Sequence, residues 1–176
     1  ALPTLQAMGN GETLFVSVAA GTTIGYFESV LGGDTPVVRA MPNTPAAISK
    51  GITAIVGNAK AGSRSLDEAE TLLSAVGEVV RLSEEAQIDA VTGVSGSGPA
   101  YVFHMIECMA AAGVAQGLPE ELAMQLAKAT VAGAGALAMQ AEEDPAQLRV
   151  NVTSPNGTTQ AALEVLMDEA EGFPPL

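Results

Sequence analysis

Residues 14–41 have the sequence LFVSVAAGTTIGYFESVLGGDTPVVRAM, and this stretch decides the fold class. Residues 14–19 are apolar and rich in valine, a pattern that predicts a β-strand. An amphipathic segment then runs through Val30 to a Gly-Gly-Asp turn and predicts a helix. Residues 36–41 form a second apolar run, which two prolines soon end. Strand, helix and strand in this order predict one βαβ unit of a parallel sheet.

Two more strands are predicted further along the chain. Residues 51–57 and 78–82 are apolar runs with β-branched residues. Between them, residues 65–68 have the sequence Ser-Leu-Asp-Glu, which matches a capping box at the start of a helix that reaches about Val76. The first part of the chain is therefore expected to be an α/β domain.

From Ser83 onward the strand patterns stop and helical patterns follow one another. This shift predicts a boundary between an α/β part, residues 1–82, and an all-helical part, residues 83–176. Two long helices are expected over residues 99–117 and 119–143, and each begins with a proline, which the first turn of a helix tolerates.

Small residues dominate the second of these helices over residues 127–137. Gly133 and Gly135 lie in the middle of the helix with no strand before them, so they indicate a packing surface rather than a phosphate-binding loop. Helices this rich in alanine and glycine have little side chain with which to build a core of their own. We therefore expect an obligate homodimer through residues 99–143.

Charge and composition exclude several classes of partner. The chain has 7 basic and 20 acidic residues and a formal net charge of -13, which repels nucleic acids and anionic membranes. No stretch of about 18 uncharged apolar residues is present, so no membrane partner is expected. One cysteine, Cys108, allows no internal disulfide, and a reducing cytoplasm fits this composition.

Metal and histidine-pair chemistry have no candidates in the sequence. His104 is the single histidine and is expected to pack in a core or an interface, and Cys108 is expected to be a small core residue. No cluster has the spacing of metal ligands, and no nucleophile elbow or Walker loop is found. We therefore expect no metal site.

Three segments could carry chemistry. Residues 94–101 place flexible small residues before a long helix, which exposes backbone N–H groups or forms a kink where another chain passes closely. Residues 18–21 and 41–45 follow two adjacent strands of the predicted sheet, where ligands bind in such folds; ordinary turns are the alternative.

The third segment, residues 151–159, is rich in hydroxyl groups and ends at a helix expected from about Gln160 to Ala170. Thr158 or Thr159 could cap this helix, which needs only one of them. Alternatively, the free N–H groups of the helix could bind a carboxylate. This second interpretation would explain how an acidic chain holds an anion.

Three motifs together resemble the pyrroline-5-carboxylate reductases. They are RAMPNTP at 39–45, DAVTGVSGSGPAY at 89–101 and NVTSPNGTT at 151–159, and the resemblance covers essentially all 176 residues. It implies part of a Rossmann-type NAD(P)-binding domain followed by an all-helical dimerisation domain. Enzymes of this family reduce 1-pyrroline-5-carboxylate to L-proline with hydride from NADPH or NADH. They form dimers, which often assemble into rings of five dimers.

The resemblance also implies roles for particular residues. The substrate carboxylate is expected on Ser154 and on the backbone of Thr158 and Thr159. The hydroxyl group of Thr159 is expected to reach the ring nitrogen of the substrate, and Glu85 to line the substrate site. The expected cofactor contacts are Val18, Ala19, Ala20 and Asn151.

Two departures from the family pattern affect these expectations. Asn156 stands where many relatives have glycine, and asparagine tolerates the left-handed backbone that the loop requires. The family's opening strand and glycine-rich turn would precede residue 1, and a further helix would follow residue 176. The chain alone is therefore expected to be inactive and to bind NADPH poorly.

Two other functions are compatible with the composition. The chain could be a helical oligomerisation module without catalysis of its own. It could also come from a related dehydrogenase that reduces imines or hydroxyacids, but such an enzyme is expected to have a catalytic lysine on the first long helix. Residues 98–117 contain no lysine.

Overall fold

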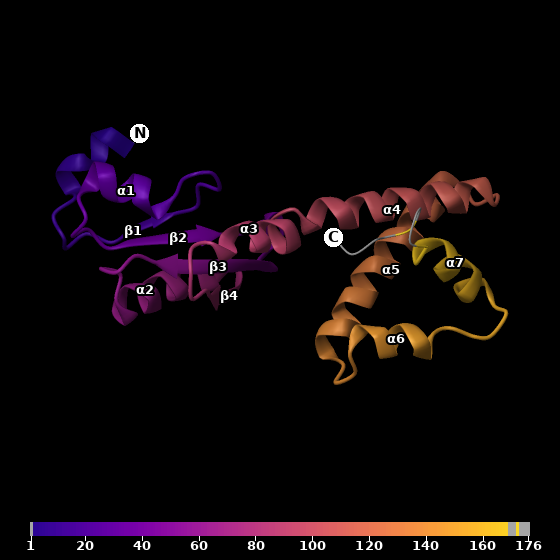
Figure 1. Cartoon of the computed structure of the whole chain (residues 1–176). Coiled ribbons are helices and arrows are strands. Elements are labelled where there is room, and N and C mark those ends of the chain that lie inside the picture. The colour runs from indigo at the N-terminus through magenta and orange to yellow at the C-terminus, as the bar shows by residue number, and fades with distance from the viewer. Residues whose placement is uncertain (1, 169–171, 173–176) are drawn as a thin grey trace. The chain divides into compact units, whose positions relative to one another are not determined.

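The computed structural model describes residues 2–168 and residue 172. The chain divides into two compact units, Ala1–Met105 and Ile106–Leu176, which are considered separately below. The first contains the sheet and the second is helical (Figure 1). The functional boundary predicted after residue 82 stays a prediction.

All four predicted strands are present in the first unit. They are β1 (Phe15–Ser17), β2 (Val37–Met41), β3 (Gly51–Gly57) and β4 (Gly77–Arg81), and they lie in this order in one sheet. β1 pairs with β2 in parallel through the helix α1 (Ile24–Leu31), as the βαβ pattern predicted. The carboxyl ends of β1 and β2 therefore lie at the same edge of the sheet.

The sheet is mixed rather than wholly parallel, because β2 and β3 are antiparallel. Only residues 42–50 connect these strands, whereas a parallel connection needs about a dozen residues or more. A short 3₁₀-helix, η2 (Thr44–Ile48), makes the reversal. The Asn43 side chain holds it by accepting a hydrogen bond from the Ile52 N–H at 3.0 Å. β3 and β4 are parallel again, joined through α2 (Ser63–Leu73) and η3 (Ser74–Val76).

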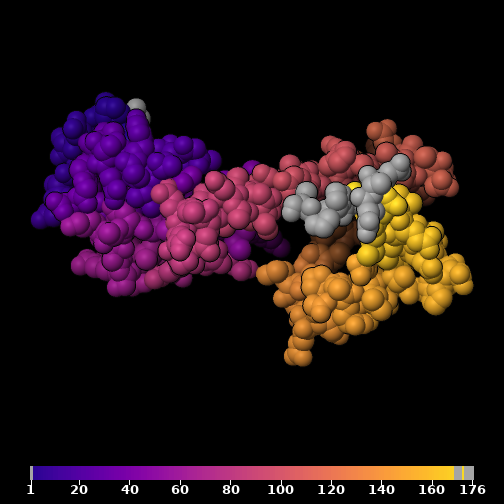
Figure 2. Space-filling view, in the orientation of Figure 1, coloured from indigo at the N-terminus to yellow at the C-terminus, as the bar shows by residue number. Residues whose placement is uncertain are grey.

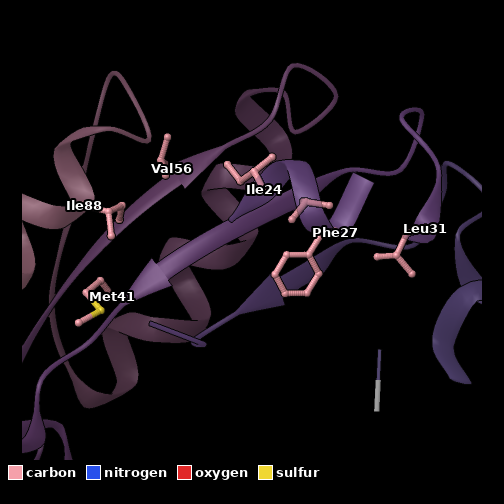
Figure 3. Packing of buried hydrophobic residues seen from close by; sticks show 7 residues of the cluster. Ile24, Phe27, Leu31, Met41, Val56 and Ile88 are labelled. Atoms are coloured by element: carbon pink, nitrogen blue, oxygen red, sulfur yellow. The ribbon is translucent and has the colours of Figure 1, made fainter. Parts of the chain in front are cut away.

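Two apolar clusters cover the two faces of the sheet. On one face, Val37 and Met41 of β2 pack with α1 and with Ile88 of α3 (Gln87–Val91) (Figure 3). On the other face, Val38 and Ala40 pack with residues that include Ala69 of α2. Side chains alternate between the two faces along β2. Arg39 therefore lies on the same face as Val37 and Met41, the face that α1 covers, and is 6% exposed there.

The predicted capping box at Ser65 is wrong. α2 begins at Ser63, its N-cap is Gly62, and Ser65 lies in the first turn. The preceding turn sets this earlier start, because the Asn58 side chain accepts a hydrogen bond from the Ala61 N–H at 2.9 Å. That contact ends β3 and directs the chain into the helix before Ser65 is reached.

The helical part follows the predicted order with shifted ends. The π-helix η4 (Thr92–Gly96) continues α3 into α4 (Gly98–Ala115). The second unit continues with α5 (Glu120–Gln140), α6 (Pro145–Asn151) and α7 (Thr158–Leu166). α6 was not predicted, although Asp144 before Pro145 is a helix-start pattern and caps the Gln147 N–H at 2.9 Å. The predicted end of the last helix at Ala170 lies outside the described residues.

Helices of the second unit bury few residues among themselves. The core cluster of this unit consists of Ala110, Ala123 and Ala127, with Ile106 and Met124 against it. α6 and α7 lie at the surface in the space-filling view (Figure 2). Large apolar side chains remain exposed on the helices of this unit, among them Met109, Leu122, Leu126, Leu137, Met139 and Val165.

α5 is also long and apolar enough to cross a membrane by length and composition. α5 contains the charged residues Glu120, Glu121 and Lys128, so it is not the uncharged apolar stretch whose absence was noted in the sequence. A single such helix is weak evidence for a membrane protein. The absence of a membrane partner stays a prediction.

The core of the first unit can be tested at β3. Ile55 is 0% exposed, so Ile55→Ala should lower the free energy of unfolding by about 2–5 kcal/mol, because it removes buried contacts and leaves a cavity. Ile48 is 71% exposed, and Ile48→Ala should change it by less than about 0.5 kcal/mol. Urea titrations followed by circular dichroism measure both variants. Equal losses would contradict the described core.

Candidate active site

The carboxyl end of β1 presents a short exposed segment. Val18 is 59% exposed, and Ala19 and Ala20 are exposed beside it. The Ser17 side chain accepts a hydrogen bond from the Ala19 N–H at 3.2 Å, which turns the chain out of the strand. The side chains at 19 and 20 are small and leave the backbone of this edge accessible, and the predicted contact of these residues with the cofactor stays a prediction.

A partly buried ion pair contacts this segment. One guanidinium nitrogen of Arg39, in β2, is 2.7 Å from Glu85 Oε1, and the other donates to the carbonyl oxygen of Ala20. The same carboxylate oxygen accepts a hydrogen bond from the Ile24 N–H at 2.9 Å. Glu85 therefore contacts the first residue of α1, and its predicted place beside the substrate stays a prediction.

The structural role of Arg39 was missed at the sequence level. Arg39 was quoted only as part of a family motif, with no role of its own. The sequence did contain a signal for this role, because Arg39 is the one charged residue in the apolar run from Pro36 to Met41. A charge on a buried strand needs a partner, but that partner lies 46 residues further along the chain.

The glycine-rich segment before α4 is a helical junction rather than a free helix start. The Ser97 N–H donates to the Thr92 carbonyl oxygen at 2.8 Å, and the side chains of Thr92 and Ser95 donate back to Ile88 and Val91. A Cβ at Gly96 would lie 2.9 Å from the Met41 side chain. These contacts favour the close-packing interpretation of this motif over anion binding.

The N-terminus of α7 lacks a side-chain cap. Gly157 is the N-cap residue, so the prediction that Thr158 or Thr159 caps the helix is wrong. In residues 2–168, no hydrogen bond is found from the N–H groups of Thr158, Thr159 or Gln160, the first turn of the helix. These N–H groups and the partial positive charge of the helix end can therefore receive an anion.

Local contacts shape the loop before α7. Asn156 has a φ of 59°, the left-handed conformation that the sequence led us to expect. Its N–H donates to Gln160 Oε1 at 2.8 Å, and the Gly157 N–H donates to the Ser154 carbonyl oxygen at 3.1 Å. The turn therefore places Ser154 beside the start of α7.

Asn151, the last residue of α6, lies at the other end of this loop. Its side-chain oxygen accepts a hydrogen bond from Gln147 Nε2 at 2.8 Å. An open concavity beside α7 is lined by Thr153, Gln160, Leu163, Glu164, Met167 and Asp168. This lining includes none of the predicted carboxylate ligands, so the two features are distinct.

Elsewhere the charged groups form exposed pairs. Hydrogen bonding to Lys60 lowers the pKa of Asp34, and the same contact raises the pKa of Lys60. Hydrogen bonds to Asp67 and Glu70 raise the pKa of Arg81. Within the described part of the chain, no group of three or more His, Cys, Asp or Glu residues could hold a metal ion.

Comparison with known proteins identifies the family. Residues 85–174, more than half of the chain, match the family model for pyrroline-5-carboxylate reductase dimerisation. The chain belongs to the pyrroline-5-carboxylate reductase family. The resemblance seen in the three sequence motifs is thereby confirmed.

Curated relatives of the family cover most of this chain. The pyrroline-5-carboxylate reductase of Pseudomonas aeruginosa is 48% identical over 162 residues, which are 92% of this chain and 59% of the relative. That of Synechocystis is 46% identical over 167 residues, 95% of this chain and 61% of the relative. The chain thus spans about three fifths of the length of these reductases.

Solved structures of the family have a similar fold. The Coxiella burnetii pyrroline-5-carboxylate reductase matches with a TM-score of 0.88 at 39% identity, covering 94% of this chain and 62% of that one. The Plasmodium falciparum pyrroline carboxylate reductase, solved with NADP bound, matches with a TM-score of 0.85 at 30% identity. The match covers 94% of this chain and 66% of the Plasmodium chain.

The predicted site residues fall into two groups in the structure. In the first unit, Ala20 and Glu85 both contact Arg39, and Val18 and Ala19 directly precede Ala20 in the chain. Asn151, Ser154, Thr158 and Thr159 lie on or beside one loop of the second unit. The roles assigned to these eight residues stay predictions.

Proposed function

We propose that this chain forms the substrate-binding and dimerisation part of a reductase that converts 1-pyrroline-5-carboxylate to L-proline with NADPH or NADH. The observation that carries the proposal is the uncapped N-terminus of α7 beside Ser154, in a chain of this family. The substrate carries a carboxylate, and a free helix N-terminus binds carboxylates.

The chain's own residues have separate tasks in this proposal. The Ser154 hydroxyl and the first N–H groups of α7 hold the carboxylate. The Thr159 hydroxyl donates a hydrogen bond to the ring nitrogen, which gains electron density during reduction. The exposed edge at Val18–Ala20 of the first unit accepts the nicotinamide. Asn151, in the second unit, is assigned separately to the nicotinamide ribose. The dinucleotide supplies the hydride when it is bound.

Assembly is the second part of the proposal. The unburied faces of α4 and α5 are covered by a second copy of the chain, which removes their apolar side chains from water. Assembly of five dimers into a ring, and a cytoplasmic location, are further parts of the same proposal. An oligomerisation module without catalysis would use the same faces, so the chemistry needs its own test.

Activity is best measured in a joined polypeptide, in which the glycine-rich segment of the Pseudomonas aeruginosa relative precedes this chain. In it, Thr159→Val should lower kcat/KM by about 10²- to 10⁴-fold, because a positioned donor at the ring nitrogen is lost. Thr158→Val is the matched control and should have a much smaller effect, since only its backbone is assigned to the substrate. Wild-type turnover in a folded Thr159→Val variant would remove Thr159 from the mechanism.

Dimer formation can be tested at Gly133 in α5. A Cβ at Gly133 meets no atom of the chain within 4 Å, so Gly133→Leu should fold normally. In a dimer packed through this small-residue surface, the added side chain should overpack the interface and shift the chain to monomers. Sedimentation equilibrium at micromolar concentration measures the shift, with exposed Thr71→Leu on α2 as control. A wild-type chain that is a folded monomer would refute the proposed assembly.

Cofactor affinity gives a further test on the 176 residues alone. They contain no G-x-G-x-x-G turn, which in doubly wound folds fixes the pyrophosphate, and their net charge of -13 opposes a polyanionic cofactor. Calorimetry should show no NADPH binding to the chain under conditions that saturate the joined polypeptide. A micromolar dissociation constant for the chain alone would mean that the cofactor site is misplaced.

A further inference from the structure

The Arg39–Glu85 pair has an arrangement that the proposed reaction does not use. The Arg39 side chain is 7% exposed and that of Glu85 is 30% exposed. Each makes one contact with the other and one with the backbone after β1, through the Ala20 carbonyl oxygen and the Ile24 N–H. The pair thereby links β2, the segment before α3 and the start of α1.

A contribution to the stability of the fold does not by itself explain why an ion pair occupies this position. Arg39 shares its face of the sheet with the apolar side chains Val37, Met41 and Ile88. Replacing a buried ion pair by apolar residues of similar volume is often neutral or stabilising, and the Arg39 side of this pair is buried. An apolar pair would fill the same space but would make no hydrogen bond to Ala20 or Ile24.

The segment that the pair contacts has few other restraints. Val18, Ala19, Ala20 and Gly21 are all exposed, so apolar burial does not hold them. Within the turn, the Thr22 N–H donates to the Ala19 carbonyl oxygen at 3.3 Å, a long hydrogen bond. The hydrogen bond from Arg39 to the Ala20 carbonyl oxygen and the one from the Ile24 N–H to Glu85 are both shorter, and both come from residues outside the segment.

We propose that Arg39 and Glu85 are positioning residues that hold the Ala20–Ile24 turn in the conformation that presents Val18–Ala20 to the dinucleotide. This proposal rests on the proposed function, because it concerns the same cofactor edge. The chemistry of the two side chains suits the task. Only the planar fork of arginine can bind a carboxylate and a carbonyl oxygen through different nitrogens. A carboxylate at Ile24 satisfies an otherwise free N–H at the positive end of α1.

The decisive variant removes the whole pair, Arg39→Met with Glu85→Leu, in the 176-residue chain. The urea midpoint should stay near that of the wild type or rise, while exchange of the Ile24 amide hydrogen should accelerate by about tenfold or more. Arg81→Met is the matched control, because Arg81 also binds two carboxylates, Asp67 and Glu70, but does not contact the turn. It should leave the exchange of Ile24 unchanged.

The kinetic consequence is measured in the joined polypeptide. The double variant should raise KM for NADPH by about 10- to 100-fold and change KM for pyrroline-5-carboxylate much less, because misplacing the edge weakens the cofactor contacts. Arg39→Lys keeps the charge but not the fork and should show part of the same effect. It also provides the test if the double variant does not fold.

Two results would overturn the positioning role. One is native exchange of Ile24 together with a native KM for NADPH in the folded double variant or in Arg39→Lys. The other is an increase confined to KM for pyrroline-5-carboxylate, which would assign Glu85 to the substrate alone. If the wild-type joined polypeptide forms no proline, the proposed function fails, whereas the exchange measurement still decides whether the pair orders the turn.

Discussion

The helices of the second unit depend on burying apolar surface that they do not bury among themselves. The core cluster of this unit is three alanines, Ala110, Ala123 and Ala127, while side chains as large as Leu126 and Met139 lie in water. Apolar surface of this kind is stable only when something covers it. The loop that carries Ser154 and Thr159 belongs to the same unit. In the assembly that we propose, the rigidity of this loop, and with it the proposed site, depends on the second copy that covers α4 and α5.

Recognition of an anion by so acidic a chain has to be local. A net charge of -13 repels a carboxylate at long range, but salt at about 0.1 M largely screens the repulsion from charges more than about 10 Å away. In the proposed site, the free N–H groups of α7 and the hydroxyl of Ser154 supply hydrogen bonds at short range without adding a basic side chain. The left-handed Asn156, held by Gln160, gives the loop the turn that brings Ser154 there. The same hydroxyl-rich motif was one of the three segments of the sequence that could carry chemistry.

Local patterns in the sequence predicted the strands and most of the helices. The direction of β3, the Arg39–Glu85 contact and the start of α2 were not predicted. Apolar runs such as Val37–Met41 revealed all four strands, because burial imposes that pattern directly. The direction of β3 was missed, since the apolar pattern of a strand is the same in either direction. The Arg39–Glu85 pair joins residues 46 positions apart, and no local pattern reports such a contact. The true start of α2 depended likewise on the Asn58 turn before it.

The uncapped start of α7 is the carboxylate site that we propose for this chain. A crystal structure of the joined polypeptide with L-proline and oxidised cofactor tests it most directly. We predict the proline carboxylate within hydrogen-bond distance of the Ser154 hydroxyl and the first N–H groups of α7, with the ring nitrogen facing the Thr159 hydroxyl. Proline bound with its carboxylate away from α7 would contradict this account of the site.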